Sequence, residues 1–217
     1  NNLHGLWGSG AKDIYAVGSG GTVLHYDGTQ WSSTTSGIFS TLQSVWGTGA
    51  SNVYAVGWPG SVILHHDGTK WVGVGSGKGA GLWGVWGPGN AEVYVAGSDC
   101  TVLHFDGSSW SSSLPWGVRK KMWALWGSGK ADVYAVGDEG TVLHNTGSGW
   151  TPVSTGNSTD LRGVWGSGKS DVFVVGIKGK VDHYNGSTWS VQKSGTLQDL
   201  TDVWGASATD VVAVGAA

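Results

Sequence analysis

The chain has little of what several function classes require. It contains one cysteine, Cys100, so no disulfide can form within it. Charged residues make up 12% of the sequence, about half of the ~25% usual in globular proteins. The net charge is −3 and no basic stripe is present, which argues against duplex nucleic acid as a partner. No apolar run approaches the ~18 residues of a membrane span, so membrane insertion is not expected.

Glycine and tryptophan are abundant, and the tryptophans recur at a fixed interval. One of them ends a short apolar run about every 40 residues, at Trp7, Trp46, Trp86, Trp126, Trp165 and Trp204. A fixed period of about 20–50 residues is typical of solenoids, propellers and other repeat architectures. The repeats begin at residues 3, 42, 82, 122, 161 and 200, which gives the ranges 3–41, 42–81, 82–121, 122–160, 161–199 and a partial 200–217.

Each repeat predicts four short strands. The first has the pattern Leu-x-small-Val/Leu-Trp, as in Leu161–Trp165, and a WGSG loop is expected to follow it. The second, such as Asp171–Val175, is almost continuously apolar, as a strand buried on both faces should be. A Gly-x-x-Gly turn, such as Gly176–Gly179, connects the second strand to the third, which is Thr22–Tyr26 in the first repeat. An Asp-Gly turn then connects the third strand to the fourth.

No helical period occurs, and four antiparallel strands per repeat are typical of a β-propeller blade. We therefore predict an all-β fold: one β-propeller domain over residues 1–217, with five complete four-stranded repeats and a half repeat. A ring of six positions with a half-built last blade is favoured. A ring of five blades, or a chain cut from a longer one, is also compatible with the count.

The run His25-Tyr26-Asp27-Gly28-Thr29-Gln30-Trp31 and its later copies resemble the Asp-box repeats of neuraminidase-like propellers. They are also similar to the propellers of photosystem II assembly factors, as is the preceding Val17–Leu24. The pattern departs from the box in having His before the Asp, one residue fewer before the Gly, and Thr146 or Asn185 in place of the Asp. The resemblance implies an architecture, in which the box is a stabilising hairpin, and implies no activity.

The resemblance to neuraminidase-like propellers implies that an enzyme of this type would need a cluster of arginines together with Tyr and Glu. The only arginines are Arg119 and Arg162, and the only glutamates are Glu92 and Glu139. We therefore expect a protein that is not an enzyme and that uses no cofactor and no metal.

The repeated histidines and acidic residues are expected to be structural. His25, His65, His104, His144 and His183 fall one per repeat on the third strand, about 10 Å apart or more, too far to share an ion. The residue before each second strand is expected to cap its turn through backbone N–H groups: Asp13, Asn52, Glu92, Asp132, Asp171 and Asp210. Cys100 replaces a turn glycine, and we expect it near the surface, where it could link two copies.

Residues that differ between copies are free of the scaffold's demands, and binding functions reside on variable loops of rigid frames. Three variable sets share one end of the repeat: the turn between strands two and three, the links between repeats, and the second residue of the first strand. The ligand-binding candidates at this end are Trp58, Trp83, Trp116, Trp123, Arg119, His4, Gln43 and Arg162. Trp83 and Trp123 could equally fill the core beside the repeated tryptophans.

Aromatic faces beside polar groups hold sugars and protein partners. We therefore expect a non-catalytic, lectin-like carbohydrate-binding module that uses the variable end. The alternative is a protein-interaction module of a secreted or surface-attached bacterial protein. A hydrolase is the third and weakest hypothesis. The oligomeric state is not predicted.

Overall fold

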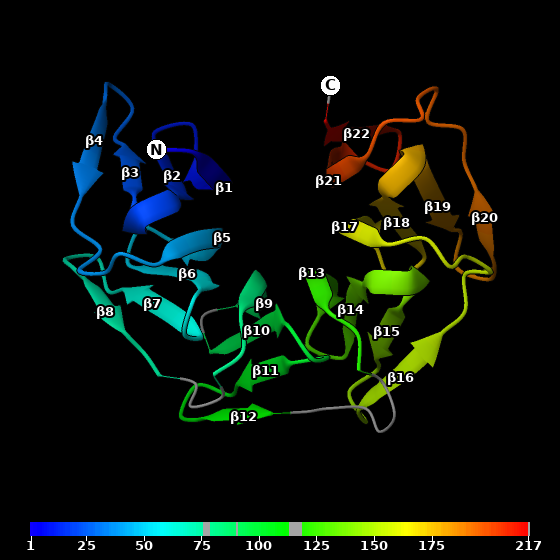
Figure 1. Cartoon of the computed structure of the whole chain (residues 1–217), viewed down its shortest axis with the longest axis horizontal. Helices are drawn as coiled ribbons and strands as arrows, with labels where there is room; N and C mark the ends of the chain where they lie inside the picture. The colour runs from blue at the N-terminus through cyan, green and yellow to red at the C-terminus, as the bar shows by residue number, and fades with distance from the viewer. Residues whose placement is uncertain (76–78, 90, 113–118, 217) are drawn as a thin grey trace. The chain divides into compact units, whose positions relative to one another are not determined.

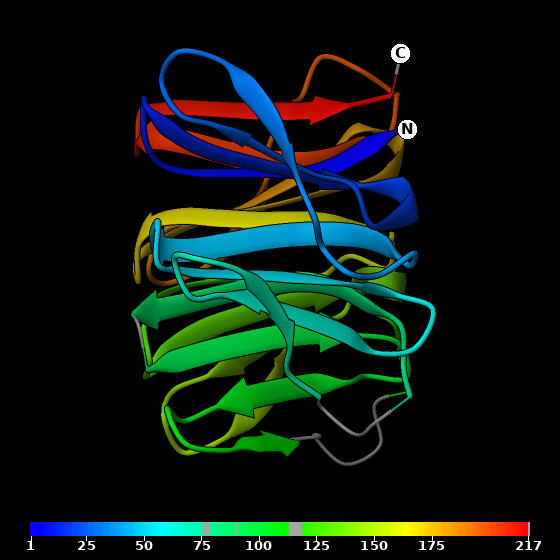
Figure 2. The same cartoon turned by 90° about the vertical axis from the view of Figure 1, so that its left-hand side faces the viewer.

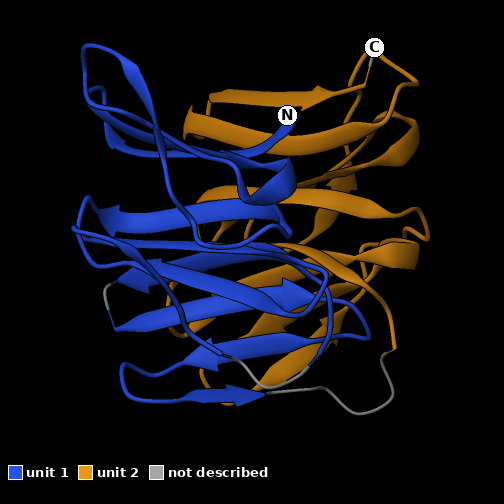
Figure 3. Ribbon diagram, turned by 60° about the vertical axis from the view of Figure 1, so that its left-hand side comes forward, with its two compact units in different colours: residues 1–112 blue, residues 113–217 orange. Residues whose placement is uncertain are grey.

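The computed structural model describes residues 1–75, 79–89, 91–112 and 119–216, and the chain falls into two compact units, residues 1–112 and 113–217 (Figure 3). The first unit holds three four-stranded antiparallel sheets (Figure 1). Their strands are β1 (Leu3–Gly10), β2 (Asp13–Gly18), β3 (Val23–Tyr26) and β4 (Trp31–Thr34); β5 (Thr41–Gly49), β6 (Asn52–Trp58), β7 (Val62–His66) and β8 (Trp71–Gly73); and β9 (Leu82–Gly89), β10 (Glu92–Gly97), β11 (Val102–Phe105) and β12 (Trp110–Ser112).

The second unit holds two four-stranded sheets and one two-stranded sheet. Their strands are β13 (Met122–Gly129), β14 (Asp132–Gly137), β15 (Val142–Asn145) and β16 (Trp150–Val153); β17 (Leu161–Gly168), β18 (Asp171–Gly176), β19 (Lys180–Tyr184) and β20 (Trp189–Val191); and β21 (Leu200–Ser207) and β22 (Asp210–Gly215). The all-β class and the four strands of each full repeat are thereby confirmed. The single domain and the closure of the sheets into a ring stay predictions.

Within every sheet each strand pairs with the next one along the chain. In each unit the strands therefore run back and forth between two ends, where the loops lie (Figure 2). Leu42 at the start of β5 pairs with Gly57 near the end of β6, so the start of each first strand lies beside the turn between strands two and three. We call this end of each sheet the variable end.

The first strand is longer than its sequence pattern predicts. β17 runs past Trp165 to Gly168, and Gly166 and Gly168 pair with Val172 and Asp171 of β18. The WGSG stretch is thus strand and not the predicted loop. Its first glycine is needed because the tryptophan of the preceding repeat lies on it.

This tryptophan–glycine contact joins successive sheets. A Cβ added to the glycine would lie less than 3.0 Å from the ring atom Cη2 of the preceding repeat's tryptophan. The pairs are Trp7 over Gly47 (2.9 Å), Trp46 over Gly87 (2.8 Å), Trp126 over Gly166 (2.6 Å) and Trp165 over Gly205 (2.6 Å). Clusters of buried side chains line the same interfaces; for example, Leu42 and Val45 of β5 pack with Tyr15 and Val17 of β2. The repeated tryptophans thus pack between successive sheets at these four positions.

The turn between strands two and three is a three-residue 3₁₀ turn in three repeats: η1 (Ser19–Gly21), η2 (Asp138–Gly140) and η3 (Ile177–Gly179). Its middle residue has positive φ, 64° at Gly20 and 59° at Lys178, which confirms the conformation that the Gly-x-x-Gly pattern predicts. These described helical segments are far too short to cross a membrane.

Cys100 is fully buried, so the prediction of a surface position is wrong. In other repeats the equivalent glycine lies under the link to the next repeat: a Cβ at Gly21 would meet the carbonyl oxygen of Ile38 at 2.1 Å, and one at Gly179 that of Thr196 at 2.0 Å. A turn residue can thus be covered by the chain that follows it. A disulfide between copies through Cys100 would require this turn to open.

Candidate functional site

A histidine on the third strand makes the same two contacts in every four-stranded sheet. Its Nε2 lies within hydrogen-bond distance of the side chain that begins the second strand: His25–Asp13 (2.7 Å), His65–Asn52 (2.8 Å), His104–Glu92 (2.5 Å), His144–Asp132 (2.7 Å) and His183–Asp171 (2.6 Å). Each imidazole also stacks on an aromatic side chain of the second strand, with ring centroids 4.1 to 4.4 Å apart: Tyr15, Tyr54, Tyr94, Tyr134 and Phe173. The prediction of structural hydrogen bonds is confirmed for these histidines.

The acidic partner of the histidine holds the first strand as well. The Ser167 hydroxyl of β17 donates to Asp171 at 2.6 Å, and Ser128 donates to Asp132 at 2.5 Å in the preceding repeat. Burial raises the pKa of Asp171, but the hydrogen bonds from Ser167 and His183 outweigh it and leave this pKa below its ordinary value. The predicted role as a backbone cap missed these side-chain partners. The repeated histidines and acidic residues thus hydrogen-bond to one another within each sheet. Among the described residues, no group of three or more His, Cys, Asp or Glu could hold a metal ion.

The Asp-Gly turn between strands three and four is held by its aspartate. In the first repeat, Asp27 Oδ1 accepts hydrogen bonds from the Thr29 hydroxyl (2.6 Å), the Thr29 N–H (2.8 Å) and the Gln30 N–H (2.9 Å). These bonds, that of the Thr29 hydroxyl first, lower the pKa of Asp27 to about 2. Asn185 accepts the equivalent backbone hydrogen bonds in the fifth repeat without carrying a charge.

We expect the folded chain to lose stability in acid because the aspartate of this turn becomes protonated. Because the pKa of Asp27 is lower in the folded chain than the ~3.9 of a free aspartate, its contribution is complete above about pH 4 and is lost as the pH falls towards 2. The pKa values of Asp67 and Asp106 are lowered for the same reason. We expect the melting temperature of the wild type to fall between pH 4 and pH 2 by more than that of the triple variant D27N/D67N/D106N. Equal decreases in the two proteins would contradict the assignment.

Every first strand carries a β-bulge at the second residue of its repeat. In β1, Leu3 pairs with Gly18 and Gly5 pairs with Val17, which leaves His4 unpaired between them. The same shift occurs at Gln43, Trp83, Trp123, Arg162 and Thr201. The extra residue of a bulge lies outside the regular ladder and is free to be re-aimed. The bulge is the physical reason why this position varies between copies.

In three repeats the bulge residue makes a hydrogen bond with the first residue of the neighbouring turn, 15 positions later. His4 Nε2 lies 3.0 Å from the Ser19 hydroxyl, the Trp83 indole N–H donates to the Ser98 hydroxyl at 3.2 Å, and the Trp123 N–H donates to Asp138 at 2.6 Å. Two of the variable sets are thus partners of one another. The constant spacing of 15 residues was the signal in the sequence that could have shown this.

In the first unit the structure brings two predicted residues together. Trp58 and Trp83 lie with ring centroids 6.1 Å apart, tilted by 43°; we call them the aromatic pair. The sequence placed Trp58 in the turn between strands two and three. In the structure it is the last residue of β6 and pairs with Thr41 of β5. It is 46% exposed, whereas Trp83 is half-buried. The aromatic pair closes over Gly81, where an added Cβ would lie 3.3 Å from Trp83 and 3.4 Å from Trp58.

In the second unit a different group forms around Trp123. The guanidinium carbon of Arg162 lies 3.9 Å from a ring centroid of Trp123, and the Lys121 ammonium lies 3.4 Å from one. Arg162 also donates to Asp160 at 3.0 Å. The pKa of Lys121 is lowered to about 8, mainly by burial; the carboxylate of Asp138 opposes this shift, and the charge of Arg162 adds to it. Trp123 is therefore half-buried under two cations and presents little free aromatic surface.

None of the remaining predicted residues that the structure describes belongs to either group. Gln43 is half-buried at the bulge of β5, and Arg119 is exposed three residues before β13. Trp116 lies outside the described residues.

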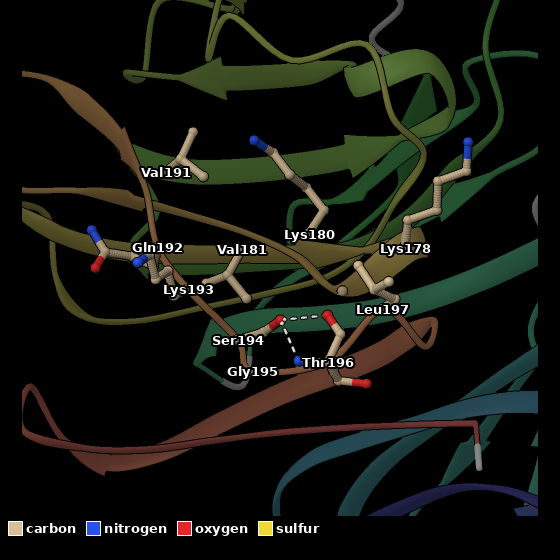
Figure 4. A pocket seen from close by; sticks show the side chains of 11 residues that line it. Lys178, Lys180, Val181, Val191, Gln192, Lys193, Ser194, Gly195, Thr196 and Leu197 are labelled. Carbon is tan, nitrogen blue, oxygen red and sulfur yellow. Dashed lines mark hydrogen bonds between the residues drawn. The ribbon is translucent and has the colours of Figure 1, made fainter.

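A groove in the fifth repeat was missed at the sequence level. It has a volume of about 500 Å³ and lies beside β19 and β20, with Lys178, Lys180 and Lys193 in its lining (Figure 4). The dashed lines there join Ser194 and Thr196 of the link that forms one wall. The Lys180 ammonium is already paired with the buried Asp182 at 2.8 Å, so the groove presents less free positive charge than its lysines suggest. In the sequence, the only feature that indicates this groove is the cluster of lysines in the fifth repeat.

No family model and no curated protein matches this sequence. Among solved structures, "YCF48 bound to D1 peptide" matches with a TM-score of 0.75 and 11% identity, over 99% of this chain and 74% of that one. "YCF48 from Cyanidioschyzon merolae" matches with a TM-score of 0.54 and 12% identity, over 99% and 92%. "Streptogramin B lyase structure" matches with a TM-score of 0.80 and 10% identity, over 93% and 72%.

At these identities the likeness concerns the fold alone. YCF48 is a photosystem II assembly factor, and both it and the lyase are β-propellers. The similarity to assembly-factor propellers is therefore confirmed, and the similarity to Asp-box propellers stays a resemblance in sequence. The chain has the all-β, propeller-like fold of these structures.

Proposed function

We propose that the chain is a non-catalytic binding module whose ligand is a segment of another protein, held at the aromatic pair. The observation that carries the proposal is the exposed Trp58 resting against Trp83 at the variable end. The other repeats have Ser19, Ser98, Asp138 and Ile177 where the second has Trp58, so the scaffold does not require tryptophan there.

The aromatic pair suits an apolar side chain of an extended peptide. The Trp83 N–H is engaged by Ser98, so this residue offers its ring to a ligand rather than its hydrogen-bond donor. Tryptophans of this kind are the usual energetic anchors of protein interfaces. A peptide-bound β-propeller among the similar folds adds support at the level of the fold, because that structure is YCF48 with the D1 peptide.

Selection of random 12-residue peptides on immobilised protein tests the proposal. We expect recovered peptides to share an apolar anchor and to bind Trp58→Ala about 10- to 100-fold more weakly than wild type. Trp31→Ala is the matched control, because Trp31 on β4 is 48% exposed and belongs to a different surface, beside Tyr26. Equal losses in both variants, or none in either, would remove the aromatic pair from the site.

Carbohydrate is the second candidate ligand, because the exposed Trp58 could stack on a sugar as well as on a side chain. A glycan array with the same two variants separates the candidates. Glycans that bind in a Trp58-dependent manner, with no selected peptide, would replace the peptide proposal. Chemical conversion of a bound peptide or glycan, seen by mass spectrometry, would contradict the non-catalytic part.

A further inference from the structure

One exposed aromatic side chain at the variable end of the first unit adds nothing to the core. Phe39 is 95% exposed, although Ile38 beside it packs on the core between the first and second sheets. The other links between repeats have a different residue at the same place, three positions before the leucine or methionine that begins the next repeat: Gly79, Arg119, Ser158 and Leu197. The scaffold therefore does not require an aromatic residue at this position.

The backbone on both sides of Phe39 is held in place. The buried Ser36 hydroxyl donates to the carbonyl oxygen of Gly21 at 2.6 Å, and the Gly21 N–H donates to the carbonyl oxygen of Ser40 at 2.8 Å. The Ser40 hydroxyl donates to the carbonyl oxygen of Pro59 at 3.2 Å. The link is thus fixed to the turn of the first sheet and to the second sheet. Because its backbone is already ordered, a ligand that binds the Phe39 ring has little loop entropy to overcome.

The last of these hydrogen bonds places Phe39 near the aromatic pair. Ser40 follows Phe39 directly and Pro59 follows Trp58 directly, so one hydrogen bond joins the neighbours of the two aromatic residues. Thr41, two residues after Phe39, pairs with Trp58. Because two residues span about 7 Å at most and paired Cα atoms lie about 5 Å apart, the Cα atoms of Phe39 and Trp58 are within about 12 Å of one another.

The chain around these two residues carries no charge. Residues 36–41 and 58–60 include no Lys, Arg, Asp or Glu, and the exposed Pro59 adds apolar surface. The charged side chains that the structure describes in the first unit lie at the opposite end of its sheets, with the exception of Asp99 in the turn of the third sheet. A ligand that brought a charge to Phe39 and Trp58 would lose hydration without gaining a partner.

We infer that Phe39 is a second anchor of the site at the aromatic pair, and that the ligand is an extended, uncharged protein segment with two apolar side chains on one face. The inference rests on the proposed function and adds the chemistry of the partner. Side chains on one face of an extended segment are about 7 Å apart at a spacing of two residues and about 13 Å apart at a spacing of four. One apolar side chain contacts Trp58, and another, two or four residues away, contacts Phe39.

Peptides selected from the random 12-residue library on the wild type are the probes. We expect them to share two apolar residues at a spacing of two or four, and to bind Phe39→Ala about 10-fold more weakly than wild type. Alanine at one of these two peptide residues should weaken binding to the wild type about 10-fold and have no further effect on Phe39→Ala, because that variant already lacks the contact. The affinity should change less than about 2-fold between about 50 and about 500 mM NaCl.

Leu197→Ala serves as the control variant, because it removes an apolar side chain that is 87% exposed from the same place in the link that ends the fifth repeat. It should bind the peptides as the wild type does. Thermal melting of both variants checks that each is folded.

The outcomes separate this inference from the proposed function. Peptides that need Trp58 but bind Phe39→Ala as tightly as the wild type would overturn the second anchor and leave the proposed function intact. Equal losses in Phe39→Ala and Leu197→Ala would overturn the second anchor as well. An affinity that falls steeply with salt would overturn the uncharged partner. Failure to recover any peptide that needs Trp58 would overturn both the inference and the proposed function.

Discussion

Replacing Gly87 with alanine is expected to lower the free energy of unfolding by about 3 kcal/mol, the upper end of the usual cost of overpacking. A Cβ at this position of β9 would lie 2.1 Å from the carbonyl oxygen of Glu92 and 2.8 Å from Cη2 of Trp46. The oxygen belongs to the backbone of the paired strand β10, so it cannot move aside as the end of a side chain could. The strain must separate β9 from β10 or lift the Trp46 ring from the interface. Urea denaturation measures the loss.

Gly89→Ala is the matched control, two residues further along β9. A Cβ there meets no atom within 4 Å, and the backbone does not have positive φ. Its effect should stay within about 0.5 kcal/mol. Equal destabilisation by both substitutions would show that strand propensity, and not the tryptophan–glycine contact, accounts for the loss at Gly87.

Leu161→Ala is expected to destabilise the chain by about 3–4 kcal/mol, within the range measured for leucines removed from cores. Leu161 begins β17, is fully buried, and packs with Val136 and Val142 of the preceding sheet. Truncation removes its apolar surface and leaves a cavity between two sheets that their strand pairing holds in place. Chemical denaturation at neutral pH measures the change.

Leu197→Ala is the matched control, because it removes the same side chain from the link that follows β20. Leu197 is 87% exposed, so its truncation should cost less than about 1 kcal/mol. Equal losses at the two positions would mean that burial against the preceding sheet does not account for the cost at Leu161.

The strands were predictable because each local signal agrees with the repeat. The apolar second strand, the Gly-x-x-Gly turn and the Asp-Gly turn appear in the structure where their patterns predict them. The error at Gly166 has a clear cause. The WGSG stretch was predicted to be a loop, whereas its glycine lies in the strand and leaves room for the Trp126 ring of another repeat. A contact between repeats cannot be seen in the composition of one of them.

The site was only partly predictable for a related reason. Trp58 could be named as a binding candidate because the other copies have no tryptophan at the same place. The partners of Trp123 did not, because Lys121, Asp138 and Arg162 come from different segments and are brought together by the bulges and by packing of neighbouring sheets. A single unpaired residue in each first strand leaves no mark in hydrophobic periodicity.

The bulge at the second residue of each repeat has an evolutionary consequence. Pairing resumes at the next residue whatever the bulged side chain is, so the strand pairing itself tolerates substitution there. Histidine, glutamine, tryptophan, arginine and threonine all occupy it in this one chain. The same strand pairing can therefore carry a different set of side chains at this end, and the frame can acquire new specificities by changes at the bulges and at the turn residues that they contact.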